Sequence, residues 1–262
     1  MTDVPKTFRR LIGEENYAVD ETGMSDSTIM LFSDKVLKIQ PDDHQSHHEY
    51  RMMQWLQGKL PVPKTLGFES DGKKAYLLMT RLSGEMACTE KNMNDPDRLT
   101  STLAEGLQRL WKVDTVGCPY SLTLDVRLSQ AKEAVEKGLV AIDDAEEDTF
   151  GENGFKDPEH LLDWLSNNKP AEDLVFSHGD FCLPNILIAG RDVSGYLDLG
   201  RAGIADRWQD IALCYRSLLH NFSGKYGGKK DRDFNANILF EKLGIKPEWD
   251  KIRYYILLDE LF

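Results

Sequence analysis

Three polar residues in the second half of the chain have the types and the spacing that catalysis needs. Asp180, Asn185 and Asp198 each lie just outside a short apolar segment, which would hold three oxygen ligands close together. Phosphoryl transfer uses such a set: one Asp orients and deprotonates the acceptor hydroxyl, while an Asn and a second Asp hold Mg²⁺ against the nucleotide phosphates. We therefore expect Asp180 to be the general base, and Asn185 and Asp198 to be the Mg²⁺ ligands.

The segments that flank these residues predict how they are positioned. Residues 174–176 predict a short buried strand that leads into the catalytic loop. Residues 186–188 and 193–197 predict a hairpin that turns near residues 190–192. Such a hairpin would bring the two metal ligands together.

Two other interpretations of this stretch are an ordinary turn and a metal-hydrolase site. Single Asp and Asn residues are common in turns, but three of them at this spacing between apolar runs favour catalysis. A metal-hydrolase site would use His178 with Asp180 and Asp198, and no second His lies nearby to complete that ligand set. We therefore expect His178 to brace the loop.

The motifs His178-Gly-Asp180 and Asp198-Leu-Gly200, with Asn185 between them, resemble the protein-kinase signature of a catalytic-loop Asp, an Asn and an Asp-x-Gly element. In this variant form they resemble the small-molecule kinases of the aminoglycoside phosphotransferase family. The resemblance extends from about Tyr17 to Phe262, and residues 200–212 are similar to the segment that follows Asp-x-Gly in the 3′-phosphotransferases. It implies an α+β, two-lobed protein-kinase-like fold, with a small antiparallel-sheet N-lobe that has one helix and a larger, mainly helical C-lobe.

The order of predicted elements agrees with such a fold. The pattern predicts strands at residues 17–19, 28–32, 35–39, 65–68 and 75–79, a helix at residues 45–57, and later helices that begin near residues 96, 125 and 158. Strands interrupted by one helix are typical of a kinase-like amino-terminal lobe. We expect residues 1–79 to form the nucleotide-binding lobe, residues 80–84 the hinge, and residues 85–262 the catalytic and substrate-binding lobe.

Lys38 is the candidate for binding nucleotide phosphates. It lies in the apolar strand 36–39, where a buried lysine needs a partner. Glu49 shares a helix face with Met52 and Met53, and an unpaired carboxylate on that buried face would be costly. We infer a Lys38–Glu49 ion pair, and the kinase resemblance implies that Lys38 also reaches the α- and β-phosphates.

Other nucleotide contacts follow from the resemblance. The turn at residues 23–27 contains one glycine and includes Ser25; it lacks the G-x-G-x-x-G spacing, and a phosphate contact and an ordinary hairpin turn remain equally open. In kinases the strand end that leads into the hinge binds adenine through its backbone, so the resemblance makes candidates of Met79, Arg81 and Leu82. Arg201, close behind the second metal ligand, is a candidate for facing the phosphates.

The composition excludes several other classes of protein. A chain of 262 residues with a net charge of −12 is unsuited to general nucleic-acid binding and would attract a cationic substrate instead. Four scattered cysteines contain no Cys-x-x-Cys pair, and His44, His47 and His48 lack a metalloprotease pattern, so we expect reduced thiols and solvated histidines. No apolar run approaches a signal peptide or a membrane span, and we expect a cytoplasmic protein without membrane partners.

Two acidic segments are candidates for substrate binding. Residues 143–148 contain five acids, and such a run is ordinarily a solvated loop. The family resemblance implies instead that this loop and the carboxyl-terminal residues bind the amino groups of an aminoglycoside. The candidate substrate residues are Glu146, Glu147, Asp148, Asp259, Glu260 and Phe262.

The resemblance therefore implies an ATP-dependent, Mg²⁺-requiring kinase that phosphorylates an aminoglycoside hydroxyl, most simply the 3′-hydroxyl, and so confers antibiotic resistance. Two positions depart from the enterococcal-type pattern: His220-Asn221 replaces an acidic pair, and Val36 replaces an aromatic residue that stacks on adenine. The first departure bears on the range of drugs and the second on adenine affinity. The alternatives are a kinase for another small hydroxylated metabolite and a catalytically silent, kinase-like binding protein.

Overall fold

The computed structural model describes residues 4–20, 27–152, 154–227, 230–231 and 233–262. The chain divides into two compact units. The first contains Met1–Gly106 and Cys182–Ala202, and the second contains Leu107–Phe181 and Gly203–Phe262. Ser25 lies outside the described residues, and the lobe and hinge boundaries expected from the sequence stay a prediction.

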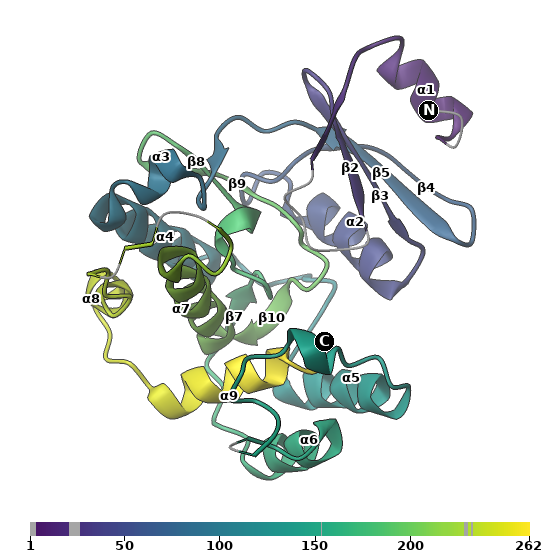
Figure 1. Ribbon diagram of the computed structural model, residues 1–262. Coiled ribbons are helices and arrows are strands. Elements are labelled where there is room, and N and C mark those ends of the chain that lie inside the picture. The colour runs from purple at the N-terminus through teal and green to yellow at the C-terminus, as the bar shows by residue number, and fades with distance from the viewer. Residues whose placement is uncertain (1–3, 21–26, 153, 228–229, 232) are drawn as a thin grey trace. The chain divides into compact units, whose positions relative to one another are not determined.

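The first unit begins with a five-stranded antiparallel sheet in the order β1-β2-β3-β5-β4 (Figure 1). Its strands are β1 (Ala18–Asp20), β2 (Thr28–Leu31), β3 (Lys35–Pro41), β4 (Thr65–Ser70) and β5 (Lys74–Thr80). All five lie within one or two residues of the predicted strands. A short helix that the sequence did not predict, α1 (Lys6–Ile12), buries Phe8 and Ile12 in a core with Phe32 and Leu37. Gly67 makes this packing possible, because a Cβ there would lie 2.5 Å from the Phe8 ring.

The predicted helix of the first unit is α2 (His44–Leu56). A capping box begins it: the Asp43 carboxylate accepts a hydrogen bond from the Ser46 amide at 2.8 Å, and the Ser46 hydroxyl accepts one from the Asp43 amide at 3.2 Å. Met52, Met53 and Leu56 are buried along one stripe of the helix, as their spacing predicts. This stripe holds α2 against the sheet and fixes the direction of the polar residues on the same face.

A second, three-stranded sheet completes the first unit, in the order β6-β8-β9. It comprises β6 (Glu85–Met86), β8 (Ile186–Ala189) and β9 (Asp192–Tyr196), and it is accompanied by α3 (Glu90–Met93), the 3₁₀ turn η2 (Leu183–Asn185) and α4 (Pro96–Trp111), which continues into the second unit. The predicted hairpin is confirmed: β8 and β9 pair antiparallel, and Gly190 provides the positive φ of the turn. The Tyr196 hydroxyl donates to the Gly106 carbonyl at 3.0 Å, which ties β9 to α4.

The second unit is mainly helical. It contains α5 (Leu124–Glu136), η1 (Ile142–Asp144), α6 (Pro158–Asn167), α7 (Arg207–Ser223), α8 (Ile238–Leu243) and α9 (Trp249–Asp259), with one antiparallel pair, β7 (Leu174–Ser177) and β10 (Gly203–Asp206). Asp206 caps α7 through the Trp208 amide and also accepts the Tyr255 hydroxyl at 2.8 Å, which joins α7 to α9. Among the described residues, no helix is both long and apolar enough to cross a membrane.

Candidate active site

The predicted ion pair between Lys38 on β3 and Glu49 on α2 is confirmed. The Lys38 Nζ lies 2.9 Å from Glu49 Oε2, and only 8% and 3% of the two side chains are exposed. Gln40, two residues along the same strand face, donates to the same Glu49 oxygen at 3.1 Å. The carboxylate therefore has two hydrogen-bond donors in a site that water hardly reaches.

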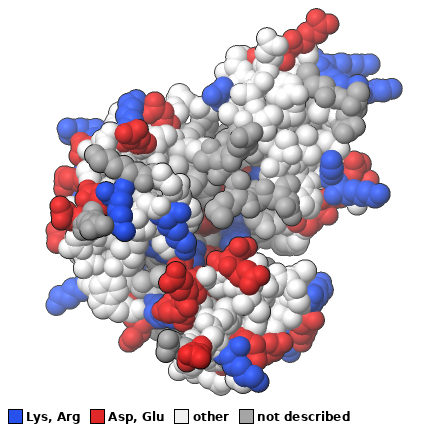
Figure 2. All heavy atoms as spheres, viewed as in Figure 1, with Lys and Arg blue, Asp and Glu red and all other residues white. Residues whose placement is uncertain are grey.

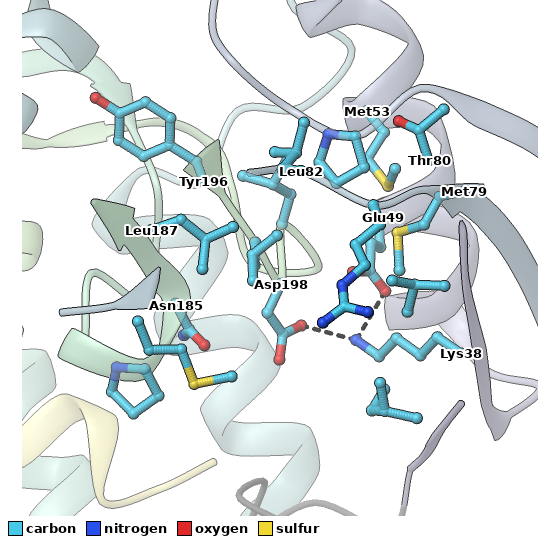
Figure 3. Close-up of a pocket in the computed structure, with 18 of the residues that line it drawn as sticks. Lys38, Glu49, Met53, Met79, Thr80, Leu82, Asn185, Leu187, Tyr196 and Asp198 are labelled. Atoms are coloured by element: carbon cyan, nitrogen blue, oxygen red, sulfur yellow. Dashed lines mark hydrogen bonds and ion pairs between the residues drawn. The ribbon is translucent and has the colours of Figure 1, made fainter. Parts of the chain in front are cut away.

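Lys38 has a second carboxylate partner in Asp198. Its Nζ lies 3.0 Å from Asp198 Oδ1, so the ammonium group bridges the two carboxylates (Figure 3). Burial by itself would lower the pKa of Lys38, but the charges of Glu49 and Asp198 outweigh it and raise the pKa above its ordinary value. Lys38 therefore carries a fixed positive charge at every physiological pH.

Asp198 has an unusual backbone. Its φ of 56° lies in the left-handed region, and no other non-glycine residue described by the structure has a positive φ. Such a conformation costs free energy for a residue with a Cβ and persists where the surroundings impose it, commonly at functional sites. The side chain is 38% exposed, so Asp198 is the more accessible of the two carboxylates that pair with Lys38.

Asn185 lies beside Asp198 in the first unit. It ends η2, and its carbonyl accepts the Leu197 amide at 2.9 Å, which ties the start of β8 to the residue before Asp198. Both side chains line the same cavity (Figure 3). An amide oxygen and a carboxylate are ligands that Mg²⁺ accepts, and Mg²⁺ commonly takes only one or two protein ligands and completes its shell with water and phosphate oxygens. The donor set therefore fits Mg²⁺.

The cavity itself is large and mostly apolar. It has a volume of about 270 Å³ and is built within the first unit. Its apolar walls include Ile29, Leu31, Val36, Met53, Met79, Leu82, Leu187, Leu197 and Leu199, and its polar groups include Lys38, Glu49, Asn185 and Asp198. Apolar walls with a few convergent polar groups are typical of a cofactor site. The charged groups could bind the phosphates of a nucleotide, and the apolar walls could pack against its base.

The hinge candidates contribute to the walls of this cavity. Met79, Arg81 and Leu82 all line it. The Arg81 guanidinium donates to the Phe32 carbonyl at 2.7 Å, which ties the end of β5 to the turn after β2. Arg201 is half-buried and is not among the residues that line the cavity, so its contact with phosphates stays a prediction.

The loop that carries Asp180 belongs to the second unit, and a buried carboxylate organises it. Asp210 on α7 accepts hydrogen bonds from the His178 and Gly179 amides at 2.8 Å and 2.9 Å. Burial raises the pKa of Asp210 to about 7, although both amide donors lower it. His178 is fully buried, and its Nδ1 accepts the Asp180 amide at 3.3 Å. His178 and Asp210 thus brace the loop, which is the role that the sequence predicts for His178.

The two acids among the carboxyl-terminal substrate candidates are paired with an arginine of α7. The Arg216 guanidinium contacts the Asp259 carboxylate and lies 3.0 Å from Glu260 Oε1. Burial raises the pKa of Glu260 to about 7, against the opposing charge of Arg216. The Phe262 ring lies under the Arg127 guanidinium, 3.8 Å from it. The end of α9 is thus a packed structure and not a frayed terminus.

The acidic loop adjoins the same cluster. The Glu146 amide donates to Glu260 Oε2 at 3.1 Å, and the Glu146 carboxylate lies 2.9 Å from His220 Nε2. Asp148 pairs with Arg253 at 3.1 Å, and Glu147 is exposed. Figure 2 shows carboxylates gathered over the part of the second unit that contains α5, α6 and α9, with basic side chains among them. The predicted substrate residues therefore lie in one acidic region, and several of their charges are paired within the chain.

The prediction of three solvated histidines is correct for His44 and His47 and wrong for His48. His48 is 2% exposed, and its Nε2 lies 2.6 Å from the Ala202 carbonyl oxygen. The reason is its helical position, because it precedes Met52 by four residues and so belongs to the buried stripe. The same period that identified Glu49 could have identified this histidine.

The comparison with known proteins agrees with this geometry. Residues 12–255 match the model of the phosphotransferase enzyme family. The chain therefore belongs to this family, and the resemblance inferred from its catalytic motifs is confirmed.

The particular relatives are aminoglycoside 3′-phosphotransferases. The protein of that name from Enterococcus faecalis is 42% identical over 217 residues, which are 82% of this chain and 78% of the relative. The one from Niallia circulans is 37% identical over 267 residues, which cover 98% of this chain and 97% of the relative. The crystal structure of the type VIII aminoglycoside 3′-phosphotransferase covers 100% of this chain and 99% of its own, with a TM-score of 0.83 at 27% identity. The α+β, kinase-like fold is thereby confirmed.

Proposed function

We propose that the protein is an ATP-dependent aminoglycoside 3′-phosphotransferase, which uses Mg²⁺ and confers resistance by phosphorylating the drug. The observation that carries the proposal is the cavity of the first unit, in which Lys38 bridges Glu49 and Asp198 beside Asn185. The names of the relatives support the choice of acceptor. The cytoplasm, where ATP is available, is the proposed place of action.

The nucleotide is held by the first unit. Its base would pack against the apolar walls, which include Val36 and Met79, and Lys38 would pair with the phosphates while Glu49 keeps its ammonium group in place. Asn185 and Asp198 would hold Mg²⁺, which when bound neutralises the charge of the phosphate oxygens. Val36 offers less surface to a base than an aromatic ring, which predicts weaker or less selective adenine binding.

Asp180 is the proposed general base. It accepts the proton of the drug hydroxyl as the hydroxyl oxygen bonds to the γ-phosphorus, and the bond from phosphorus to the bridging oxygen of ADP breaks. The products are ADP, the phosphorylated drug and one proton that leaves Asp180 for solvent. The amides held by Asp210 keep this loop in one conformation, so Asp180 need not be reorganised during turnover.

The acidic region of the second unit is the proposed drug site. Glu146, Glu147, Asp148, Asp259, Glu260 and Phe262 are its candidate residues. Ammonium groups of the drug would compete there with the cations of the chain, among them Lys225, which lies 3.3 Å from Glu146. Contacts between exposed ammonium and carboxylate groups weaken as salt rises, so drug affinity should fall with ionic strength.

The test is steady-state ADP release with Mg-ATP and a panel of acceptors, namely kanamycin, neomycin, amikacin and hydroxylated amines that are not aminoglycosides. Asp180→Asn is the matched control because it keeps the shape of the side chain and removes the base. Kanamycin- or neomycin-dependent turnover that falls about 10²- to 10⁴-fold in the control is expected. Full turnover in Asp180→Asn would refute the assignment of the base.

A kinase for another hydroxylated amine is the second candidate, and one observation favours it. His220 stands beside Glu146 at a position where enterococcal-type relatives are expected to carry an acid. Turnover with a non-aminoglycoside acceptor alone would establish this function. Normal Mg-ATP binding without turnover on any acceptor would instead indicate a silent binding protein.

A further inference from the structure

The backbone that follows Asp198 is held by a histidine of α2. His48 Nε2 lies 2.6 Å from the Ala202 carbonyl oxygen, and both residues are buried. A carbonyl oxygen only accepts hydrogen bonds, so Nε2 must carry the proton and donate it. The bond joins two elements that are 154 positions apart in the chain. It fixes the far end of the segment Asp198–Ala202.

The same helix face contacts this segment at its middle and its beginning. Gln45 lies against Gly200, where an added Cβ would come within 2.6 Å of the Gln45 Cγ. Glu49 reaches Asp198 through the ammonium group that the two carboxylates share. Gln45, His48 and Glu49 are spaced by three and four residues, so a single face of α2 holds the whole segment.

We propose that His48 is a positioning residue for Asp198: it holds the segment Asp198–Ala202 on α2 and so keeps the Mg²⁺ ligand in its left-handed conformation. The inference rests on the proposed function in so far as Asp198 is a Mg²⁺ ligand. A non-glycine residue keeps a left-handed φ only while its surroundings enforce it, so loss of the His48 contact should let Asp198 change its backbone conformation. His48 is not among the residues that line the cavity, and in this proposal it acts through the backbone that it binds.

His48 and its neighbour Glu49 hold two different groups of the site on the same helix. Glu49, the next residue, holds the lysine that pairs with phosphates, and His48 holds the metal loop. A shift of the helix would therefore disturb both groups together. Loss of the His48 bond alone should disturb Asp198 far more than Lys38, because the pair with Glu49 at 2.9 Å still holds the ammonium group.

The test compares nucleotide binding with and without Mg²⁺ in three variants. His48→Leu removes the donor, His48→Gln keeps an N–H donor at a similar reach, and His47→Leu is the matched control because this neighbouring imidazole is exposed. Titration calorimetry with ATP, first in EDTA and then in saturating Mg²⁺, gives the ratio of the two affinities. Steady-state kinetics give kcat and KM.

In His48→Leu the factor by which Mg²⁺ strengthens ATP binding should fall about 10-fold, while the affinity in EDTA stays within about 2-fold of the wild type. The value of kcat should fall about 10- to 100-fold, as expected for a displaced reacting group, and KM should change little. His48→Gln should recover most of both losses, and His47→Leu should match the wild type. Where His48→Leu does not fold, His48→Asn, whose amide is too short to reach Ala202, takes its place with the same expected losses.

The inference would be overturned if Mg²⁺ strengthened ATP binding as much in His48→Leu as in the wild type. It would also be overturned if His48→Leu weakened ATP binding equally with Mg²⁺ and in EDTA, or if His48→Gln did not restore the Mg²⁺ effect. Wild-type protein whose ATP affinity does not respond to Mg²⁺ would overturn it as well. The binding experiment needs no acceptor. A wild type that turns over no aminoglycoside but shows the expected Mg²⁺ response would refute the proposed function and leave the role of His48 supported.

Discussion

Replacement of Lys38 by methionine should destabilise the first unit more than replacement of its partner Glu49 by leucine. Lys38→Met leaves Glu49, of which 3% is exposed, without a cation and removes the positive charge that separates it from Asp198. Glu49→Leu leaves Lys38 paired with Asp198 at 3.0 Å. The structure thus predicts an asymmetry that a simple two-residue pair would not have.

The size of the effect follows from the distances. At 2.9 Å and an effective dielectric constant of about 20, the gross attraction between Lys38 and Glu49 is about 6 kcal/mol. Part of it offsets the cost of removing both charges from water, so the free energy of unfolding should fall by about 3–5 kcal/mol in Lys38→Met and by less in Glu49→Leu. The double variant Lys38→Met/Glu49→Leu should recover to within about 1–2 kcal/mol of the wild type, because apolar residues of similar volume replace a buried pair at little cost.

The assay is urea unfolding followed by circular dichroism and by tryptophan fluorescence, to which Trp55 on α2 contributes from the first unit and the other four tryptophans from the second. Turnover measured on the same samples separates stability from catalysis: the double variant should be stable and inactive, because no ammonium group remains to pair with phosphates. A loss below about 1 kcal/mol in Lys38→Met, or a double variant no more stable than Lys38→Met, would refute the account of a buried, coupled pair.

Two further predictions concern the acidic region of the second unit. Glu260 has a folded-state pKa of about 7, above its ordinary 4.5. The folded state therefore binds more protons than the unfolded state between these pH values, and stability should fall as pH rises from about 4.5 to about 7. The urea midpoint should depend less on pH in Glu260→Gln than in the wild type across this range. Equal slopes of midpoint against pH in the two proteins would contradict the raised pKa of Glu260. His220→Glu should lower KM for kanamycin several-fold and leave KM for ATP unchanged. The uncharged control His220→Gln should leave KM for kanamycin unchanged. Identical kanamycin kinetics in the wild type and both variants would show that position 220 does not select the acceptor.

Much of this protein can be predicted from short-range patterns. Alternating apolar residues predict the strands around Lys38, and the helical period of Met52 and Met53 identifies Glu49 as a buried acid that needs a partner. The spacing of Asp180, Asn185 and Asp198 indicates phosphoryl transfer before any coordinates are known. These signals are local, because side-chain direction repeats every two residues in a strand and every 3.6 in a helix.

Other features depend on contacts between distant segments, which no local period specifies. The sequence predicts a Lys38–Glu49 pair but not that Asp198, 160 positions later, shares the same ammonium group. It identifies a departure at His220 but not its contact with Glu146. The sequence also does not predict the hydrogen bond of His48, since its partner is the Ala202 carbonyl, and a backbone group leaves no trace in residue type. Residue chemistry and spacing thus determined the reaction class, whereas only the tertiary structure decided which groups share charges and hydrogen bonds, because those partners meet through folding and not through proximity in the chain.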